Sequence, residues 1–186
     1  VKEKDRLPPI KITSGTIRAT AALSLGRIGD DRAVAPLMET LKDEECGVRA
    51  QAAAALGMIG DDRAVEALLA CTGDAESWVR DEAETALGVL VSTVTVELLR
   101  QGTAHDNPLI RSAANRLLAL TPDPELFRLL VESLGDPDPG VRAAAAAALG
   151  RLGDPRARKF LMTLLEDGSP LPRGAAAESL GWLGEA

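Results

Sequence analysis

The chain has 186 residues, of which 46% are hydrophobic but only 2% aromatic, and its formal net charge is −7. This charge argues against nucleic acid as a partner, because phosphate binding needs a basic face. No apolar run reaches the length of about 18 residues that a membrane span needs, and two cysteines make no disulfide framework. We therefore expect a cytoplasmic protein with free thiols and no membrane partner.

An apolar residue followed by arginine recurs along the chain every 31 residues. The pair starts at Ile17, Val48, Val79, Ile110 and Val141, with Pro172 in an altered sixth copy. A fixed period in this range is typical of a solenoid, in which each repeat contacts only its neighbours. We predict an all-α fold, an α-α superhelix (α-solenoid) of about five to six helical hairpins over residues 17–186.

Residues 1–16 do not carry the first helix of the repeat. Pro8 and Pro9 would break such a helix, because proline lacks a backbone donor and clashes with the preceding turn. We expect an N-terminal lead-in or a degenerate cap over this range.

From residue 17 the helical pattern is regular. Ile17, Ala21, Leu25 and Ile28 recur on one face of a helix, and a glycine able to end the helix follows. The next position holds a side chain that can cap a second helix: Asp30, Asp61, Ser92, Asp123 or Asp154. Proline then occupies the first helical position at 124 and 155, where it loses no hydrogen bond. This phasing predicts helices starting near residues 17, 31, 48, 62, 79, 93, 110, 124, 141, 155 and 172.

The repeat at residues 92–109 departs most from the pattern. Val91 replaces the glycine that ends the helix in other copies, and residues 92–96 are rich in β-branched side chains, which lower helix propensity. We expect this repeat to be irregular.

The motif over Val48–Asp61 and Val141–Asp154 resembles the HEAT-like repeats named after phycobilisome lyases. The resemblance covers residues 17–184 and implies an α-solenoid whose arginine-bearing helices line the concave side. Members of this family include bilin lyase subunits, metal-binding hydroxylases and protein-binding scaffolds. Fold alone does not choose among these functions.

The recurring arginines allow two interpretations, an anion-binding track or a structural ladder in which each arginine holds an acidic loop. The acidic loops contain Asp43, Asp74, Asp136 and Asp167. We favour the structural ladder, because a residue used once per repeat is typical of a scaffold. Its members are Arg18, Arg49, Arg80, Arg111, Arg142 and Arg173.

The sequence offers little for catalysis. His105 is the only histidine, whereas the hydroxylases of this repeat family hold iron with several His-Glu pairs and its DNA glycosylases need a basic cleft. Cys46 and Cys71 lack the further ligands that zinc requires. We expect no catalytic residues, no metal, no cofactor and no enzymatic activity. The glycines inside the helices (Gly26, Gly57, Gly88, Gly150 and Gly181) do not fit a phosphate loop and indicate close helix contacts.

The remaining candidate is the surface that the repeat leaves free on the concave side. Exposed Trp, Met and Leu beside Arg are typical of protein-binding patches. For Trp182 a second interpretation is equally good, namely that it covers the end of the stack. The predicted face consists of Gln51, Met58, Trp78, Glu82, Val89, Arg116, Leu120, Arg151, Glu178 and Trp182.

These observations lead to one hypothesis and two alternatives. The hypothesis is a non-enzymatic scaffold that binds a protein or peptide in a shallow concave groove. The alternatives are a subunit or chaperone of a tetrapyrrole (bilin) lyase-type system, and a structural segment of a larger protein. Because a solenoid needs polar caps, the unfinished repeat that ends the sequence also raises self-association through uncapped ends.

Overall fold

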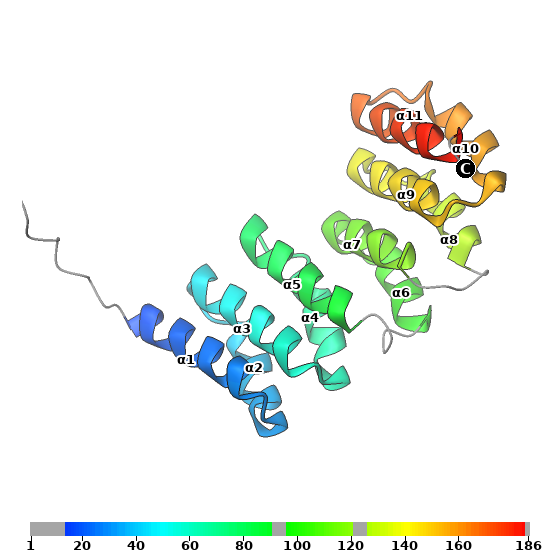
Figure 1. The fold of residues 1–186 in the computed structure, drawn as a ribbon. Helices are drawn as coiled ribbons and strands as arrows, with labels where there is room; N and C mark the ends of the chain where they lie inside the picture. Colours follow the sequence, from blue (N-terminus) through cyan, green and yellow to red (C-terminus); the bar gives the residue numbers. More distant parts are fainter. Residues whose placement is uncertain (1–13, 91–95, 121–125, 185–186) are drawn as a thin grey trace, which may run out of the picture.

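The computed structural model describes residues 14–90, 96–120 and 126–184, and within these ranges every regular element is helical. The helices follow one another as a stack of helical hairpins (Figure 1). None of the described helices is long and apolar enough to cross a membrane.

The helices form two layers. The odd layer holds α1 (Ser14–Ile28), α3 (Cys46–Ile59), α5 (Ser77–Val89), α7 (Pro108–Leu118), α9 (Pro139–Leu152) and α11 (Pro170–Gly184). The even layer holds α2 (Val34–Thr40), α4 (Val65–Cys71), α6 (Val96–Thr103), α8 (Leu126–Ser133) and α10 (Arg158–Leu164). Short 3₁₀ turns precede three of the even helices: η2 (Asp31–Ala33), η3 (Asp62–Ala64) and η4 (Pro155–Ala157).

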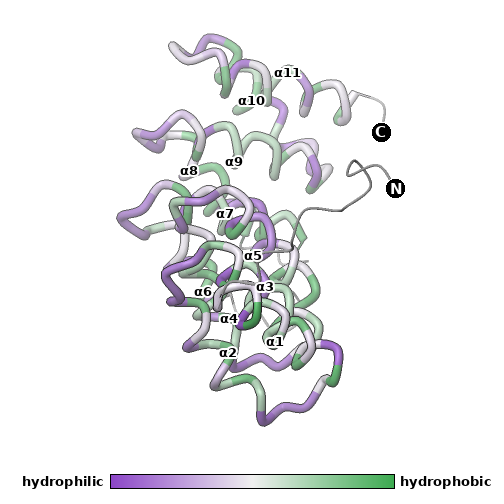
Figure 2. The backbone as a smooth tube through the Cα atoms, turned by 90° about the vertical axis from the view of Figure 1, so that its left-hand side faces the viewer, coloured by the Kyte–Doolittle hydropathy of each residue, from purple (hydrophilic) through white to green (hydrophobic). Residues whose placement is uncertain are grey.

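Each even helix packs against the odd helix that follows it, and the odd helices also pack on one another along the stack. Viewed from the side, the stack is bowed, with the odd helices on the inner side of the curve (Figure 2). The odd layer therefore supplies the inner face of the molecule.

The odd helices begin slightly earlier than the sequence period predicts. α1 begins at Ser14 instead of residue 17, and the other odd helices begin two residues before the expected position. Asn107 and Asp138 explain the shift for α7 and α9, because each side chain accepts a hydrogen bond from the first turn and a proline follows. The arginine marks the repeat, but these caps set the helix start.

The predicted caps of the even helices are present at three positions. Asp30, Asp61 and Asp154 each accept a hydrogen bond of 2.9 Å from the backbone N–H two residues further on. Gly29, Gly60 and Gly153 precede them with φ between 69° and 76°, the left-handed conformation that ends a helix. The caps predicted at 92 and 123, and the proline at 124, lie outside the described residues.

Close packing of the odd helices depends on three of the predicted glycines. A Cβ added at Gly26 would lie 2.6 Å from the backbone of Ala55, and one at Gly57 would lie 2.8 Å from the Cβ of Ala86. A Cβ added at Gly150 would likewise lie 2.5 Å from the side chain of Ser179. The prediction is wrong for Gly88 and Gly181, where an added Cβ would meet nothing within 4 Å.

The open space at Gly88 marks an irregular junction between α5 and α7, which touch at far fewer positions than the other consecutive odd helices. The repeat places Leu117 where the other copies carry Ala55, Ala86 or Ser179. A leucine is too large to enter the notch that a glycine leaves, so the two helices stay further apart.

The apolar residues on one face of the first helix are largely exposed. Ile17 and Ile28 are 60% and 71% exposed, and Ala21 is also exposed. The helical spacing of these residues is real, but α1 is the first helix of the described stack. Within the described ranges no further repeat covers that side, so of these four residues only the half-buried Leu25 packs against the core.

Candidate functional site

Nine of the ten residues of the predicted binding face lie on odd helices, Leu120 follows the end of α7, and each of the ten is exposed or half-buried. Five of them gather on α3 and α5: Gln51, Met58, Trp78, Glu82 and Val89. They line two neighbouring grooves on the inner face, and these grooves form the candidate site.

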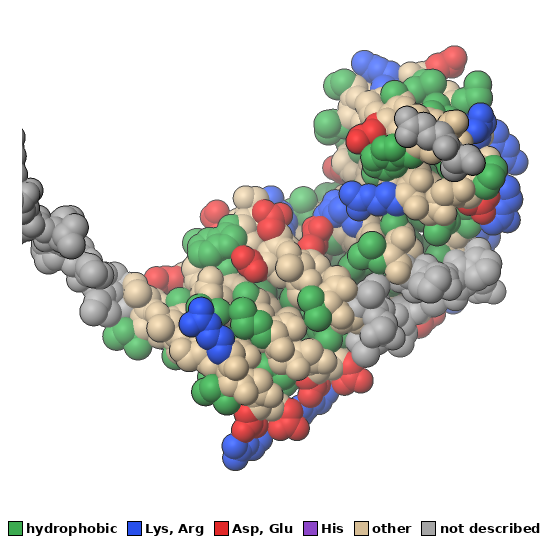
Figure 3. Space-filling model, in the orientation of Figure 1, with side chains coloured by type: hydrophobic (Ala, Val, Ile, Leu, Met, Phe, Trp, Pro, Cys, Tyr) green, Lys and Arg blue, Asp and Glu red, His purple; other side chains and the backbone are tan. Residues whose placement is uncertain are grey.

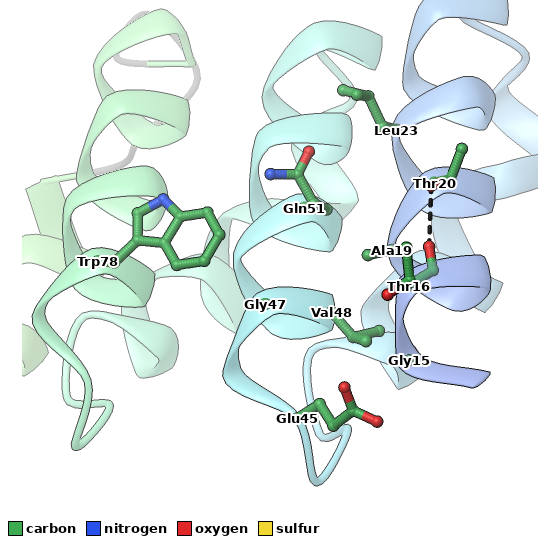
Figure 4. Close-up of a pocket in the computed structure, with 10 residues that line it drawn as sticks. All are labelled: Gly15, Thr16, Ala19, Thr20, Leu23, Glu45, Gly47, Val48, Gln51 and Trp78. Atoms are coloured by element: carbon green, nitrogen blue, oxygen red, sulfur yellow. Dashed lines mark hydrogen bonds between the residues drawn. The ribbon is translucent and has the colours of Figure 1, made fainter. Parts of the chain in front are cut away.

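The first groove runs between α1, α3 and α5 (Figure 4). Trp78 reaches from α5 towards α3, where a Cβ added at Gly47 would lie 3.8 Å from the indole ring. The indole Nε1 donates a hydrogen bond of 3.3 Å to Oε1 of Glu82, one turn further along α5. The groove is lined by Gly15, Thr16, Ala19, Thr20, Leu23, Glu45, Gly47, Val48, Gln51 and Trp78.

The second groove lies between α3 and α5, next to the first. Met58 and Val89 form part of its walls, and they are 52% and 65% exposed. Gly57 and Ala86, which hold the two helices close together, also line this groove. Glu82 lines it too, so the Trp78–Glu82 hydrogen bond connects the two grooves.

The other five predicted residues do not line either groove. Arg116 on α7 instead forms an ion pair with Glu84 on α5. Its Nε donates a hydrogen bond of 2.8 Å to Oε2 of Glu84, and its Nη2 donates a second hydrogen bond to Oε1. This ion pair bridges the irregular junction. Leu120, Arg151, Glu178 and Trp182 are exposed further along the stack.

Four of the six predicted ladder arginines make the same contact. Each guanidinium donates two hydrogen bonds of 2.7–2.9 Å to the carboxylate of an aspartate 25 residues further on. A third donor, Nη1, bonds to a backbone carbonyl of the loop before the arginine's own helix in Arg49, Arg111 and Arg142. The ladder thereby joins the loops of successive repeats. The four pairs are Arg18–Asp43, Arg49–Asp74, Arg111–Asp136 and Arg142–Asp167.

Arg80 and Arg173 depart from this ladder. Among the described residues, the Arg80 side chain donates only to the backbone carbonyls of Asp74 and Ala75, with hydrogen bonds of 2.8 Å each. The position 25 residues further on holds His105 instead of aspartate. The Nδ1 of His105 still accepts the loop hydrogen bond, from the N–H of Asn107 at 3.0 Å, but offers no carboxylate to a guanidinium. The 25-residue spacing was present in the sequence, and with it this gap could have been found.

The ladder pairs account for lowered pKa values without indicating a reactive group. The hydrogen bond from Arg142 lowers the pKa of Asp167 to about 2, and Arg63 does the same for the Asp61 cap. Burial raises the pKa of the Cys71 thiol to about 11, which makes it a poor nucleophile. In the described ranges, no group of three or more His, Cys, Asp or Glu side chains could hold a metal ion.

Sequence reasoning missed two features outside the inner face. Phe127 and Phe160 pack edge to face on α8 and α10, with ring centroids 6.2 Å apart. The Arg156 guanidinium lies over the Phe127 ring, 4.5 Å from its centroid, and the Lys159 ammonium lies over the Phe160 ring, 4.7 Å from its centroid. The second feature is Asn115, which is fully buried and whose side-chain amide has no hydrogen-bond partner among the residues that the structure describes.

Comparison with solved structures supports the helical-repeat fold. A mutant of Kap121p has a TM-score of 0.72 and 16% identity, over 90% of this chain and 24% of that chain. A chain from a study of microtubule plus end tracking by XMAP215, CLIP-170 and EB1 has a TM-score of 0.66 and 21% identity, over 92% of this chain and 87% of that chain. A chain from a study of microtubule polymerases with tumor overexpressed gene domain arrays has a TM-score of 0.61 and 14% identity, over 92% of this chain and 44% of that chain. At these identities the likeness shows the fold alone.

The sequence itself matches the family of HEAT repeats over residues 11–88 and 96–185. No curated protein matches the chain. The match is to HEAT repeats as a class and does not single out the lyase-type repeats. It covers most of the chain and confirms the predicted all-α solenoid. The chain therefore belongs to the HEAT-repeat family.

Proposed function

We propose that this chain is a non-enzymatic scaffold that binds a protein or peptide in the two grooves of α3 and α5. The observation that carries the proposal is the exposure of Met58, Trp78 and Val89 on adjoining grooves of the inner face. Trp is among the residues that most often dominate binding energy at interfaces, and Met is also enriched there. Covering these side chains would remove apolar surface from water.

The position of Trp78 supports a binding role. Its indole is held by Glu82 and lies beside the backbone of Gly47, so its orientation is partly fixed before a partner arrives. A pre-organised anchor loses less conformational freedom on binding than a free side chain does. Trp78 is nevertheless 48% exposed, which leaves much of the ring available for contact.

Selection from a displayed peptide library tests the proposal. Peptides that bind the immobilised chain are expected to lose binding to a Trp78→Ala/Met58→Ala double variant, while its helical circular dichroism stays unchanged. A matched control removes two exposed apolar side chains at the end of α10, Met162 in the helix and Leu165 directly after it, which are 59% and 39% exposed. This control should bind the selected peptides as the parent chain does.

The opposite pattern would contradict the proposal. If the selected peptides bind the Trp78→Ala/Met58→Ala variant as tightly as the parent chain, the two grooves are not the binding site. Loss of binding in the α10 control alone would place the site on the even layer.

A further inference from the structure

We infer that the partner segment that fits the two grooves is basic and amphipathic, with apolar side chains that enter the grooves and lysine or arginine beside them. This inference rests on the proposed function and names the chemistry of its partner. It follows from the distribution of charge over the stack and from the residues that line the grooves.

The negative charge of the described chain lies in its first half. Residues 14–90 contain seven basic and fourteen acidic side chains, a net charge of −7, whereas residues 96–120 and 126–184 together contain ten basic and nine acidic ones, a net charge of +1. The two grooves of α3 and α5 lie in the acidic half. Acidic side chains flank the hydrophobic ones over these helices (Figure 3).

Many acidic side chains of this half are already paired with arginine. Asp43 and Asp74 are held by the ladder, and the caps Asp30 and Asp61 are bound by Arg32 and Arg63. These carboxylates fix loops and helix starts. The charge that remains for a partner must come from other acidic residues.

Glu45 and Glu82 supply such charge at the grooves themselves. The Glu45 carboxylate lies against Gly15 in the first turn of α1 (Figure 4), and its nearest cation, Arg18 at 3.5 Å, is already engaged with Asp43. Glu82 bonds to the neutral indole of Trp78. The residues lining the two grooves include no lysine or arginine.

This arrangement selects the charge of the partner. An acidic segment would bring its carboxylates close to Glu45 and Glu82 with no cation among the lining residues to balance them. A basic segment would instead be attracted over a distance of about 8 Å at physiological ionic strength. Charge complementarity of this kind raises the association rate and rejects partners of the wrong sign.

Two labelled peptides with the same apolar residues test the inference, one carrying Lys and Arg and the other Asp and Glu at its polar positions. Fluorescence anisotropy with the full chain is expected to show the basic peptide binding at least about tenfold more tightly than the acidic one. High salt should reduce the difference in affinity between the two peptides, because it screens their charges. Trp78→Ala should abolish binding of the basic peptide.

Charge-removing variants locate the effect. Glu45→Gln/Glu82→Gln keeps the size of both side chains and an oxygen acceptor for the Trp78 indole, and should weaken binding of the basic peptide several-fold and reduce its salt dependence. Glu39→Gln/Glu66→Gln removes the same charge from exposed positions on α2 and α4 of the same half. This control should change the affinity much less, because its side chains lie on the even layer.

The outcomes separate this inference from the proposed function. Tighter, Trp78-dependent binding of the acidic peptide would overturn the inference and leave the binding role of the grooves intact. Binding of the basic peptide that ignores both Trp78→Ala and Glu45→Gln/Glu82→Gln would show only general attraction to a negative protein and would overturn the inference. Binding that appears only after removal of residues 1–13 would assign the grooves to the chain's own N-terminal segment, and would also overturn it.

Discussion

Asn115 is a polar exception in the mostly apolar core of this stack. It is fully buried on α7, and within the described part of the chain neither its amide nitrogen nor its amide oxygen has a hydrogen-bond partner. The same position of other copies holds Ala53 and Ala146, both fully buried. A buried amide that gives up water without gaining a partner lowers the stability of the fold.

Replacing this side chain should therefore stabilise the protein. Asn115→Ala is expected to raise the free energy of unfolding by about 1–3 kcal/mol, the cost of an unsatisfied buried polar group. Urea denaturation followed by circular dichroism would measure the change. Ala146→Asn places the same amide one repeat further on and should lower the stability. A lower stability of Asn115→Ala would show that its shape matters more than its missing hydrogen bonds.

At the scale of the helix, the spacing of the odd layer is set by glycine and the small residue that faces it. Gly57 and Gly88 occupy the same repeat position, but Gly57 meets Ala86 closely and Gly88 meets nothing within 4 Å. The difference lies in the partner helix, since Leu117 replaces the small residue opposite Gly88.

Alanine substitutions at these two glycines should have opposite effects. Gly57→Ala is expected to lower the free energy of unfolding by about 1–3 kcal/mol, because the added methyl group overpacks the contact with α5. Gly88→Ala adds a methyl group in open space and should raise it by up to about 1 kcal/mol through helix propensity. Thermal unfolding of both variants would compare them. Equal destabilisation would mean that the junction closes in solution.

These glycines also show which features of the structure can be predicted from the sequence and which cannot. The 31-residue period predicts the helical hairpins and places the start of each odd helix within three residues of the observed one. It can do so because each period corresponds to one helical hairpin. It could not tell that Gly88 is open or that Ile17 is exposed, because both depend on what a neighbouring helix presents. Of the predicted face, Trp78 and Met58 do lie on adjoining grooves, but Arg116 is tied to Glu84 across a junction that no single copy reveals.

At the scale of the whole molecule, several features coincide between α5 and α7. The arginine ladder lacks its pair at Arg80, the glycine notch at Gly88 stays empty, and the family match is interrupted over residues 89–95. The charge also changes there, from the acidic first half to the nearly neutral second half. We conclude that the stack is least continuous at this junction.

His105→Asp should repair part of this junction. The new carboxylate would occupy the ladder position facing Arg80, and the melting temperature at neutral pH is expected to rise. The pKa of ladder aspartates is lowered in the folded state, so the gain should be present above about pH 4 and lost as the pH falls towards about 2. Adding Arg80→Ala should remove the gain. A gain that survives this second change would come from the loop and not from the ladder.

The most direct test of the binding face uses the fluorescence of Trp78 itself. The chain has two tryptophans and no tyrosine, so Trp182→Phe leaves Trp78 as the only strong emitter. Titration with the basic amphipathic peptide, itself free of tryptophan, should shift the Trp78 emission to shorter wavelength as the half-exposed ring becomes covered. An unchanged emission spectrum at a peptide concentration that saturates the anisotropy signal would contradict the account, because the peptide would then bind away from the grooves.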